Sequence, residues 1–252
     1  VREGSRSSKI PFDWEDPATW PSALEGVQAA YVTFFPDLAV PGAPAAITEL
    51  VRQAQAAGVE KLVLLSGRGE PNAEKCEQIV RQSGLRFTLV RASWFNQNFD
   101  EGQLTEPVLE GVVALPVGEV REPFVDADDI AEVAVAALTE EGHDGQLYEV
   151  TGPRLLTFAQ AMHEVSRAAG RPVQLVSISP DEFRPALTAT AGPEVAELLT
   201  WLFTEVLDGR NASVADGVQR ALGRAPRDFA DYARAAAASG AWDPSARERR
   251  TA

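Results

Sequence analysis

Two groups of side chains in the middle of the sequence are suited to ligand chemistry. Ser66-Gly67 closes one short apolar run, and Trp94–Asn98 follows the next one. A small hydroxyl, aromatic rings and side-chain amides suit a flat, weakly polar ligand. Open α/β sheets bind ligands at the carboxyl ends of their strands, so we expect these residues to line a binding crevice.

Other reactive residue types are scarce. Lys75 follows Ser66 by nine residues on an expected helix. It is a candidate for ligand contact or proton donation, although a lysine on a helix surface is the commoner outcome. We expect Cys76 to be a small core residue, and His143 and His163 to be structural or solvated.

Short apolar runs alternate with amphipathic segments and would position these residues. The pattern predicts strands at 31–35, 61–66 and 86–91, with a helix at 42–57 that Gly58 ends. Runs this short and this apolar are typical of parallel strands covered on both faces. The chain is therefore predicted to be an α/β protein with a doubly wound parallel sheet.

The second half of the chain changes character. We expect Asp128-Asp129 to cap a helix, and residues 146–150 and 173–177 to be strands. Thr157 should cap a helix that Gly170 ends. Apolar stripes from 195 to 206 and from 229 to 236 predict a mainly helical carboxyl-terminal part that covers the ligand edge of the sheet.

Composition narrows the class of protein. The 252 residues are 45% hydrophobic and carry a formal net charge of -14, which disfavours binding to nucleic acid or to anionic membranes. The basic cluster Arg247–Arg250 is a terminal tail. One cysteine and two histidines leave few ligands for a metal, so no metal site is expected. No apolar run approaches the ~20 residues of a membrane span, and a cytoplasmic protein is expected.

Seven segments resemble, in order, a family of known proteins. They are Phe12–Trp20, Ala23–Val27, Val63–Ser66, Ser83–Leu85, Arg91–Asn98, Pro123–Ala131 and Tyr148–Pro153. The series is similar to the NmrA-like atypical short-chain dehydrogenases, and most similar to their ergot-alkaloid (agroclavine and festuclavine) dehydrogenase branch.

The resemblance implies a Rossmann-type fold. It assigns residues 1–150 to an NAD(P)-binding domain and residues 151–252 to a mainly helical substrate-side portion. In that family a Gly-x-x-Gly-x-x-Gly loop holds the cofactor pyrophosphate at a helix amino terminus. These residues contain no such loop, and Val1–Ser8 resembles the end of the family's second strand, so we expect the sequence to begin after the phosphate cradle.

The resemblance also suggests which residues bind the adenosine half of the cofactor. Arg6, between Ser5 and Ser7, lies where similar proteins contact the adenosine ribose. A guanidinium beside hydroxyls can hold a 2′-phosphate, which favours NADPH over NADH. An exposed terminal arginine is the alternative. Asp13 resembles a residue that meets the adenine amino group, and a turn cap is equally consistent with its surroundings.

The remaining expected contacts lie at strand ends. Further cofactor contacts are expected at Thr33, Phe34, Ser66, Gly67, Ala92, Ser93 and Trp94, and substrate contacts at Trp94, Phe95, Asn96 and Asn98. Proline is usual in the family at the position of Ala92, so the following loop is expected to be less rigid.

The catalytic expectation rests on Ser66 and Lys75. Ser66 falls where ordinary short-chain dehydrogenases place a serine that bonds the substrate carbonyl, but their Tyr-x-x-x-Lys pair is absent. We expect an NADPH-dependent oxidoreductase of secondary metabolism, monomeric or homodimeric, that reduces an aromatic or polycyclic quinone, enone or imine. A non-catalytic NADP-binding redox sensor and a cofactor-independent isomerase or cyclase are the alternatives.

Overall fold

The computed structural model describes residues 1–244, so the basic cluster Arg247–Arg250 lies outside the described residues. Two compact units form. The first comprises Val1–Ala92, Ala131–Glu149 and Arg220–Leu222, and the second comprises Ser93–Ile130, Val150–Gln219 and the described chain from Gly223. The chain therefore passes between the two units several times.

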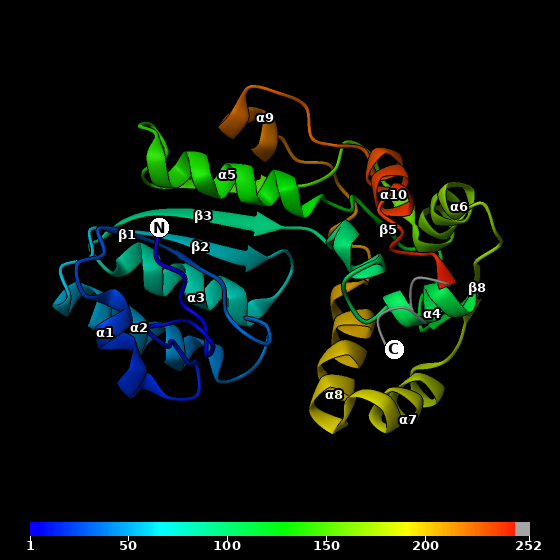
Figure 1. Cartoon of the computed structure of the whole chain (residues 1–252), viewed down its shortest axis with the longest axis horizontal. Coiled ribbons are helices and arrows are strands. Elements are labelled where there is room, and N and C mark those ends of the chain that lie inside the picture. The colour runs from blue at the N-terminus through cyan, green and yellow to red at the C-terminus, as the bar shows by residue number, and fades with distance from the viewer. Residues whose placement is uncertain (245–252) are drawn as a thin grey trace. The chain divides into compact units, whose positions relative to one another are not determined.

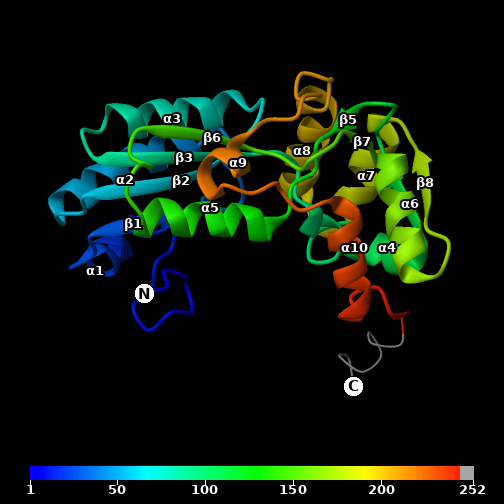
Figure 2. The ribbon, with the colours of Figure 1, turned by 90° about the horizontal axis from the view of Figure 1, so that it is seen from above.

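A parallel sheet forms the centre of the first unit. Its strands are β1 (Ala29–Val32), β2 (Lys61–Gly67), β3 (Arg86–Ala92) and β6 (Gln146–Val150), in the order β1-β2-β3-β6. The pairs β1–β2 and β2–β3 are parallel. Helices α2 (Ala43–Ala56) and α3 (Pro71–Gln82) cover one face, and α5 (Ala127–Thr139) covers the other (Figures 1 and 2). This confirms the predicted α/β class.

Burial explains why these segments take these forms. Leu62, Val63 and Leu64 of β2 are all at most 1% exposed, as expected of a strand with helices on both faces. The predicted stripe of α2, which includes Ile47 and Leu50, is buried against the same core. The first unit also contains η1 (Pro17–Thr19), α1 (Trp20–Leu24) and the end of α9 (Gly217–Leu222).

The strand predicted at 31–35 is β1, which begins earlier and ends at Val32. The Thr33 carbonyl accepts a hydrogen bond from the Trp14 indole at 3.1 Å, and Pro36 has no N–H to donate. The ladder with β2 therefore stops before Phe35, which is 70% exposed.

The second unit is mainly helical. It contains η2 (Asn96–Phe99), α4 (Thr105–Glu110), β4 (Val112–Leu115), β5 (Arg121–Glu122), β7 (Leu156–Thr157), α6 (Phe158–Ala169), β8 (Gln174–Ser177), α7 (Pro180–Ala191), α8 (Pro193–Trp201), η3 (Leu202–Val206) and α10 (Phe229–Ala238). Strands β4 and β8 pair in parallel, and β5 pairs with β7. Helices α6 and α10 lie side by side (Figure 2).

Side-chain and glycine caps define both ends of α6 and the start of α5. Thr157 caps α6 in a capping box with Gln160, and Gly170 ends that helix in the left-handed conformation, as predicted. The cap expected for α5 at Asp128-Asp129 is wrong. The first turn of α5 is held by Asp126, whose Oδ1 accepts from the backbone N–H of Asp128 at 3.0 Å.

Asp129 has a different role from the expected cap. Its side chain is fully buried, and its carboxylate binds Arg224 at 2.7 Å and Arg227 at 2.5 Å. Removing one partner of a buried ion pair is costly, so these contacts fix the segment before α10 to the start of α5.

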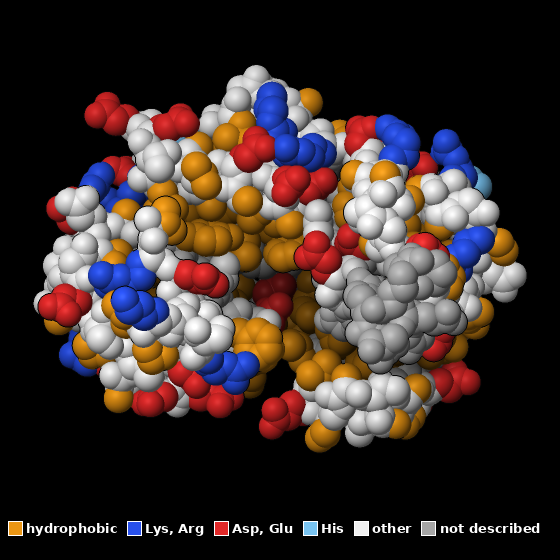
Figure 3. Space-filling view, in the orientation of Figure 1, with side chains coloured by type: hydrophobic (Ala, Val, Ile, Leu, Met, Phe, Trp, Pro, Cys, Tyr) orange, Lys and Arg blue, Asp and Glu red, His pale blue; other side chains and the backbone are white. Residues whose placement is uncertain are grey.

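On the face of the first unit seen in Figure 3, acidic and basic side chains are interspersed. Across residues 1–244, we find no helix both long and apolar enough to cross a bilayer. The same residues contain no group of three or more His, Cys, Asp or Glu side chains arranged to hold a metal ion.

Candidate functional site

The candidate site of the first unit is the carboxyl edge of its parallel sheet. Strands β1, β2 and β3 are neighbours and end at Val32, Gly67 and Ala92. Ligands of open α/β sheets bind at this edge. The segments that follow β1 and β2 therefore contain the residues on which a cofactor site in this unit would depend.

Ser66 is part of a buried ionic network. Its hydroxyl donates to Oε1 of Glu77 at 2.7 Å, and both residues are at most 4% exposed. Arg91 donates to both Glu77 oxygens, at 2.8 and 2.5 Å, and to Glu149 at 3.0 Å. Bidentate charge-assisted bonds of this kind are strong. A substrate carbonyl could receive the Ser66 proton only if the bond to Glu77 broke.

Lys75 is exposed on α3. Its Nζ donates to Oδ1 of Asn72 at 3.1 Å, and Asn72 in turn donates to the Ala39 carbonyl at 2.8 Å. This places the lysine on the helix surface, which the sequence indicated as the commoner outcome. Its suggested catalytic role remains a hypothesis.

A pair of carboxyl groups lies at the same edge and has no signature in the sequence. Asp37 follows β1, and Glu70 precedes α3; their side chains are hydrogen-bonded to each other. Glu70 is only 9% exposed and lies over Gly67, where an added Cβ would meet its carboxylate oxygens at 2.1 to 2.4 Å. A side chain at position 67 would therefore displace the Glu70 carboxyl from its place.

The expected adenosine contacts form a polar turn. The Ser5 hydroxyl lies 3.3 Å from that of Ser7 and 2.8 Å from that of Ser8. Arg6 is exposed between them and makes no hydrogen bond or ion pair with residues 1–244. A free guanidinium flanked by hydroxyls is chemically suited to a phosphate.

Asp13 serves the local turn. Its Oδ1 accepts from the Glu15 backbone N–H at 3.0 Å, and its carbonyl accepts from the Trp20 indole at 2.6 Å. This is the turn-cap geometry, which the sequence analysis left as an alternative to an adenine contact.

Two further expected cofactor contacts lie just beyond β1. Phe34 is half-buried against Trp14, with ring centroids 4.7 Å apart. Thr33 is exposed just beyond β1.

The expected substrate residues belong to the second unit. Trp94 is half-buried and packs on Phe203 and Phe158, with ring centroids 4.8 and 5.8 Å apart. Phe95 is also half-buried and bridges Val125 through its backbone. Ser93, which begins this segment, is buried and donates its N–H to the Val150 carbonyl at 3.1 Å. These rings offer an apolar wall in this unit.

The two asparagines of this segment differ. Asn96 is fully buried, and neither atom of its amide has a hydrogen-bond partner within the described chain. Such a group is costly unless it is satisfied in some other state of the protein. Asn98 is half-buried beside Gly102, where an added Cβ would lie 3.0 Å from the Asn98 Cα.

Tyr232 is another residue that the sequence indicated only as core. It is 5% exposed, and its hydroxyl donates to Asp100 at 2.6 Å. Burial first, then the bond to Asp100, raises the pKa of Tyr232 far above its ordinary value. The tyrosine is therefore held neutral, and no local motif would have revealed a partner 132 positions away.

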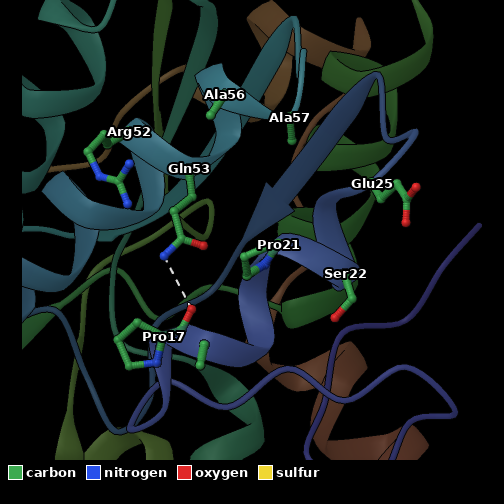
Figure 4. A pocket seen from close by; sticks show the side chains of 9 residues that line it. Pro17, Pro21, Ser22, Glu25, Arg52, Gln53, Ala56 and Ala57 are labelled. Atoms are coloured by element: carbon green, nitrogen blue, oxygen red, sulfur yellow. Dashed lines mark hydrogen bonds between the residues drawn. The ribbon is translucent and has the colours of Figure 1, made fainter.

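A pocket of about 760 Å³ opens elsewhere in the first unit (Figure 4). It lies between η1, α1 and the last turns of α2. The Gln53 amide nitrogen at its wall donates to the Pro17 carbonyl at 3.2 Å. Because α2 runs back from the carboxyl edge, its last turns lie toward the amino ends of the strands. The pocket is thus separate from the expected cofactor edge.

Comparison with solved structures defines the class of fold. The NADPH complex of the quinone oxidoreductase QOR2 from Escherichia coli superposes with a TM-score of 0.74 over 89% of this chain and 81% of that one, at 22% identity. At that identity the likeness establishes the fold, which is the Rossmann type.

Sequence relatives define the family. An NAD(P)H azoreductase from Xenophilus azovorans is 36% identical over 238 residues, covering 90% of this chain and 82% of the relative. Festuclavine dehydrogenase from Aspergillus fumigatus is 27% identical over 241 residues, covering 88% and 81%. No family model matches the chain. The chain belongs to the NmrA-like atypical short-chain dehydrogenases.

Proposed function

We propose that this protein is an NADPH-dependent oxidoreductase that reduces an aromatic or polycyclic small molecule of the quinone, enone or imine type. The observation that carries the proposal is the 36% identity to an NAD(P)H azoreductase over 90% of the chain. The parallel sheet supports it, because Rossmann-type proteins hold dinucleotides at the carboxyl edge of such a sheet.

The residues present fit the adenosine half of NADPH. Arg6 has a guanidinium without partners among the described residues, and Ser5 and Ser7 add hydroxyls beside it. Together they would hold the 2′-phosphate that distinguishes NADPH from NADH. Thr33, Phe34 and Gly67 would meet the cofactor where β1 and β2 end.

The protein's own residues would contribute orientation more than proton transfer. When bound, NADPH supplies the hydride. The Ser66 hydroxyl donates a hydrogen bond to Glu77, and the Lys75 ammonium donates one to Asn72, so each would have to leave its present partner to donate to a substrate. A site of this kind suits acceptors that take hydride without a strong protein acid, and rate would come mainly from alignment of the two reactants.

The substrate would meet the aromatic residues of the second unit. Trp94, Phe95 and Asn98 are half-buried and would supply two rings and an amide, whereas the amide of the fully buried Asn96 would contribute only in another state of the protein. Flat apolar bodies with a few polar atoms match such a lining.

A screen tests this proposal. The full chain is incubated with NADPH and a panel of quinones, enones, azo dyes and iminium compounds, and the loss of nicotinamide absorbance is followed. We expect turnover with at least one aromatic acceptor and slower turnover with NADH. Binding of NADPH without turnover on any acceptor would contradict the catalytic proposal and favour a redox-sensing role.

A further inference from the structure

The Asp37–Glu70 carboxyl pair joins two elements of the first unit. Glu70 occupies the N-cap position of α3, where an acidic side chain ordinarily accepts hydrogen bonds from the helix N–H groups. Its carboxyl makes no such bond and instead lies over Gly67 and meets Asp37. The Glu70 side chain therefore contacts the segment that follows β1.

This contact needs a proton. Ionised carboxylates only accept hydrogen bonds, so two carboxyl groups can bond each other only when one is protonated. Burial raises the pKa of Asp37, and the hydrogen bond that it accepts from the Ala39 N–H at 2.7 Å opposes this rise. Burial, and then the Asp37 charge, raise the pKa of Glu70 well above its ordinary value. Glu70 is thus the donor and Asp37 the acceptor.

A second link holds the same connection without a proton. The Asn72 amide, on the first turn of α3, donates to the Ala39 carbonyl at 2.8 Å. The segment 36–39 is therefore tied to the start of α3 at two points. Of these two links, only the Asp37–Glu70 contact depends on a bound proton.

We propose that the Asp37–Glu70 pair is a proton-dependent clamp that holds segment 36–39 against the start of α3. The clamp thereby positions Thr33 and Phe34 at the carboxyl edge. Its existence does not require NADPH, whereas its effect on NADPH affinity rests on the proposed function. Glu70 acts here as a positioning residue.

Several charged residues surround Glu70. Glu77 on α3 adds to the rise in the pKa of Glu70, and it is itself paired with Arg91 of β3. Arg68, two residues before Glu70, pairs with Glu149 of β6 at 3.5 Å. Glu74 and Lys75 lie on the exposed side of α3.

The clamp should weaken as the pH rises. The pKa of Glu70 is higher in the folded chain than its ordinary value of 4.5. The stabilising contribution of the clamp is therefore fully present below that ordinary value and is lost as pH rises through the folded pKa. Above the folded pKa two adjacent carboxylates repel each other.

Hydrogen exchange of the full chain without nucleotide tests the clamp. The Ala39 amide is followed from mildly acidic to mildly alkaline pH, with correction for the intrinsic exchange rate. We expect its protection to fall by up to about tenfold per pH unit above the folded pKa. In Glu70→Gln the amide donor persists at every pH, so protection should stay constant.

Control variants separate the effect of the clamp on amide protection from other effects of a substitution. Glu74→Gln removes an exposed acid of the same helix and should behave as the wild type. Asn72→Ala should lower protection at every pH without changing its pH dependence. Should Glu70→Gln not fold, Asp37→Asn carries the same expectation.

Two results would overturn the clamp: protection of Ala39 that does not change with pH in the wild type, or a pH dependence that persists in Glu70→Gln. A second readout is the NADPH dissociation constant, expected to rise with pH in the wild type and to stay constant in Glu70→Gln. Failure to bind NADPH at any pH would contradict the proposed function, while the exchange experiment would still decide the clamp.

Discussion

At the scale of single residues, the main finding is the hydrogen-bond partner of Ser66. Its position in the sequence suggests a carbonyl contact, but its hydroxyl donates to a buried carboxylate that Arg91 also binds. The carboxylate belongs to Glu77 of α3. Its partner Arg91 lies 14 positions away, on a strand, so no local pattern could have paired them.

Substitution of Ser66 distinguishes a structural role from a catalytic one. In Ser66→Ala we expect the free energy of unfolding to fall by about 1.5 to 3 kcal/mol, because a buried hydrogen bond to a charged group is lost. We expect turnover of the best acceptor to slow by less than about tenfold. Urea unfolding and steady-state kinetics measure the two effects. Turnover slowed by roughly 100-fold or more, with unchanged stability, would show instead that the serine meets the reacting atoms.

At the scale of elements, periodicity and caps were sufficient to predict α2, α6 and α10 and the strands β2 and β3. Each has a regular apolar pattern, and several have a local stop signal such as Gly58 or Gly170. The errors arose where distant partners decide the outcome. The strand β1 stops because Trp14 takes the Thr33 carbonyl, and Asp129 is buried by arginines from beyond α9.

The capping box of α6 gives a prediction at this scale. Thr157→Ala removes an acceptor for the Gln160 N–H, now bonded at 3.1 Å, so we expect a loss of about 1 kcal/mol in unfolding free energy. Thr139→Ala, at the exposed end of α5, is the matched control and should change stability by less than about 0.5 kcal/mol. Equal effects of the two variants in urea unfolding would contradict the assignment of the cap.

At the scale of the whole molecule, the expected site residues fall in both units. Residues from Ser5 to Ala92 belong to the first, and Ser93 to Asn98 belong to the second. The α/β class and the ligand edge follow from runs of adjacent residues, so the sequence could predict them. The Asp37–Glu70 and Tyr232–Asp100 contacts depend on tertiary packing of separate segments, so it could not.

Cys76 offers a probe of the first unit as a whole. It is fully buried, and burial, followed by the charge of Glu77, raises the pKa of its thiol to about 12. Only the thiolate reacts with alkylating reagents, so we expect the native chain at neutral pH to react at least ~100-fold more slowly than the urea-unfolded chain. Mass spectrometry after timed alkylation measures both rates. Rapid alkylation of the native chain would contradict the burial of this helix face.

The central claim is that this protein is an oxidoreductase that prefers NADPH to NADH. The most direct measurement is fluorescence titration of the full chain and of Arg6→Ala with NADPH and NADH, with Lys9→Ala as a control for a neighbouring exposed cation. We expect tighter binding of NADPH, and a loss of about tenfold or more for NADPH alone in Arg6→Ala, because only NADPH carries the 2′-phosphate. Equal losses for both nucleotides, or no binding of either by the wild type, would contradict it.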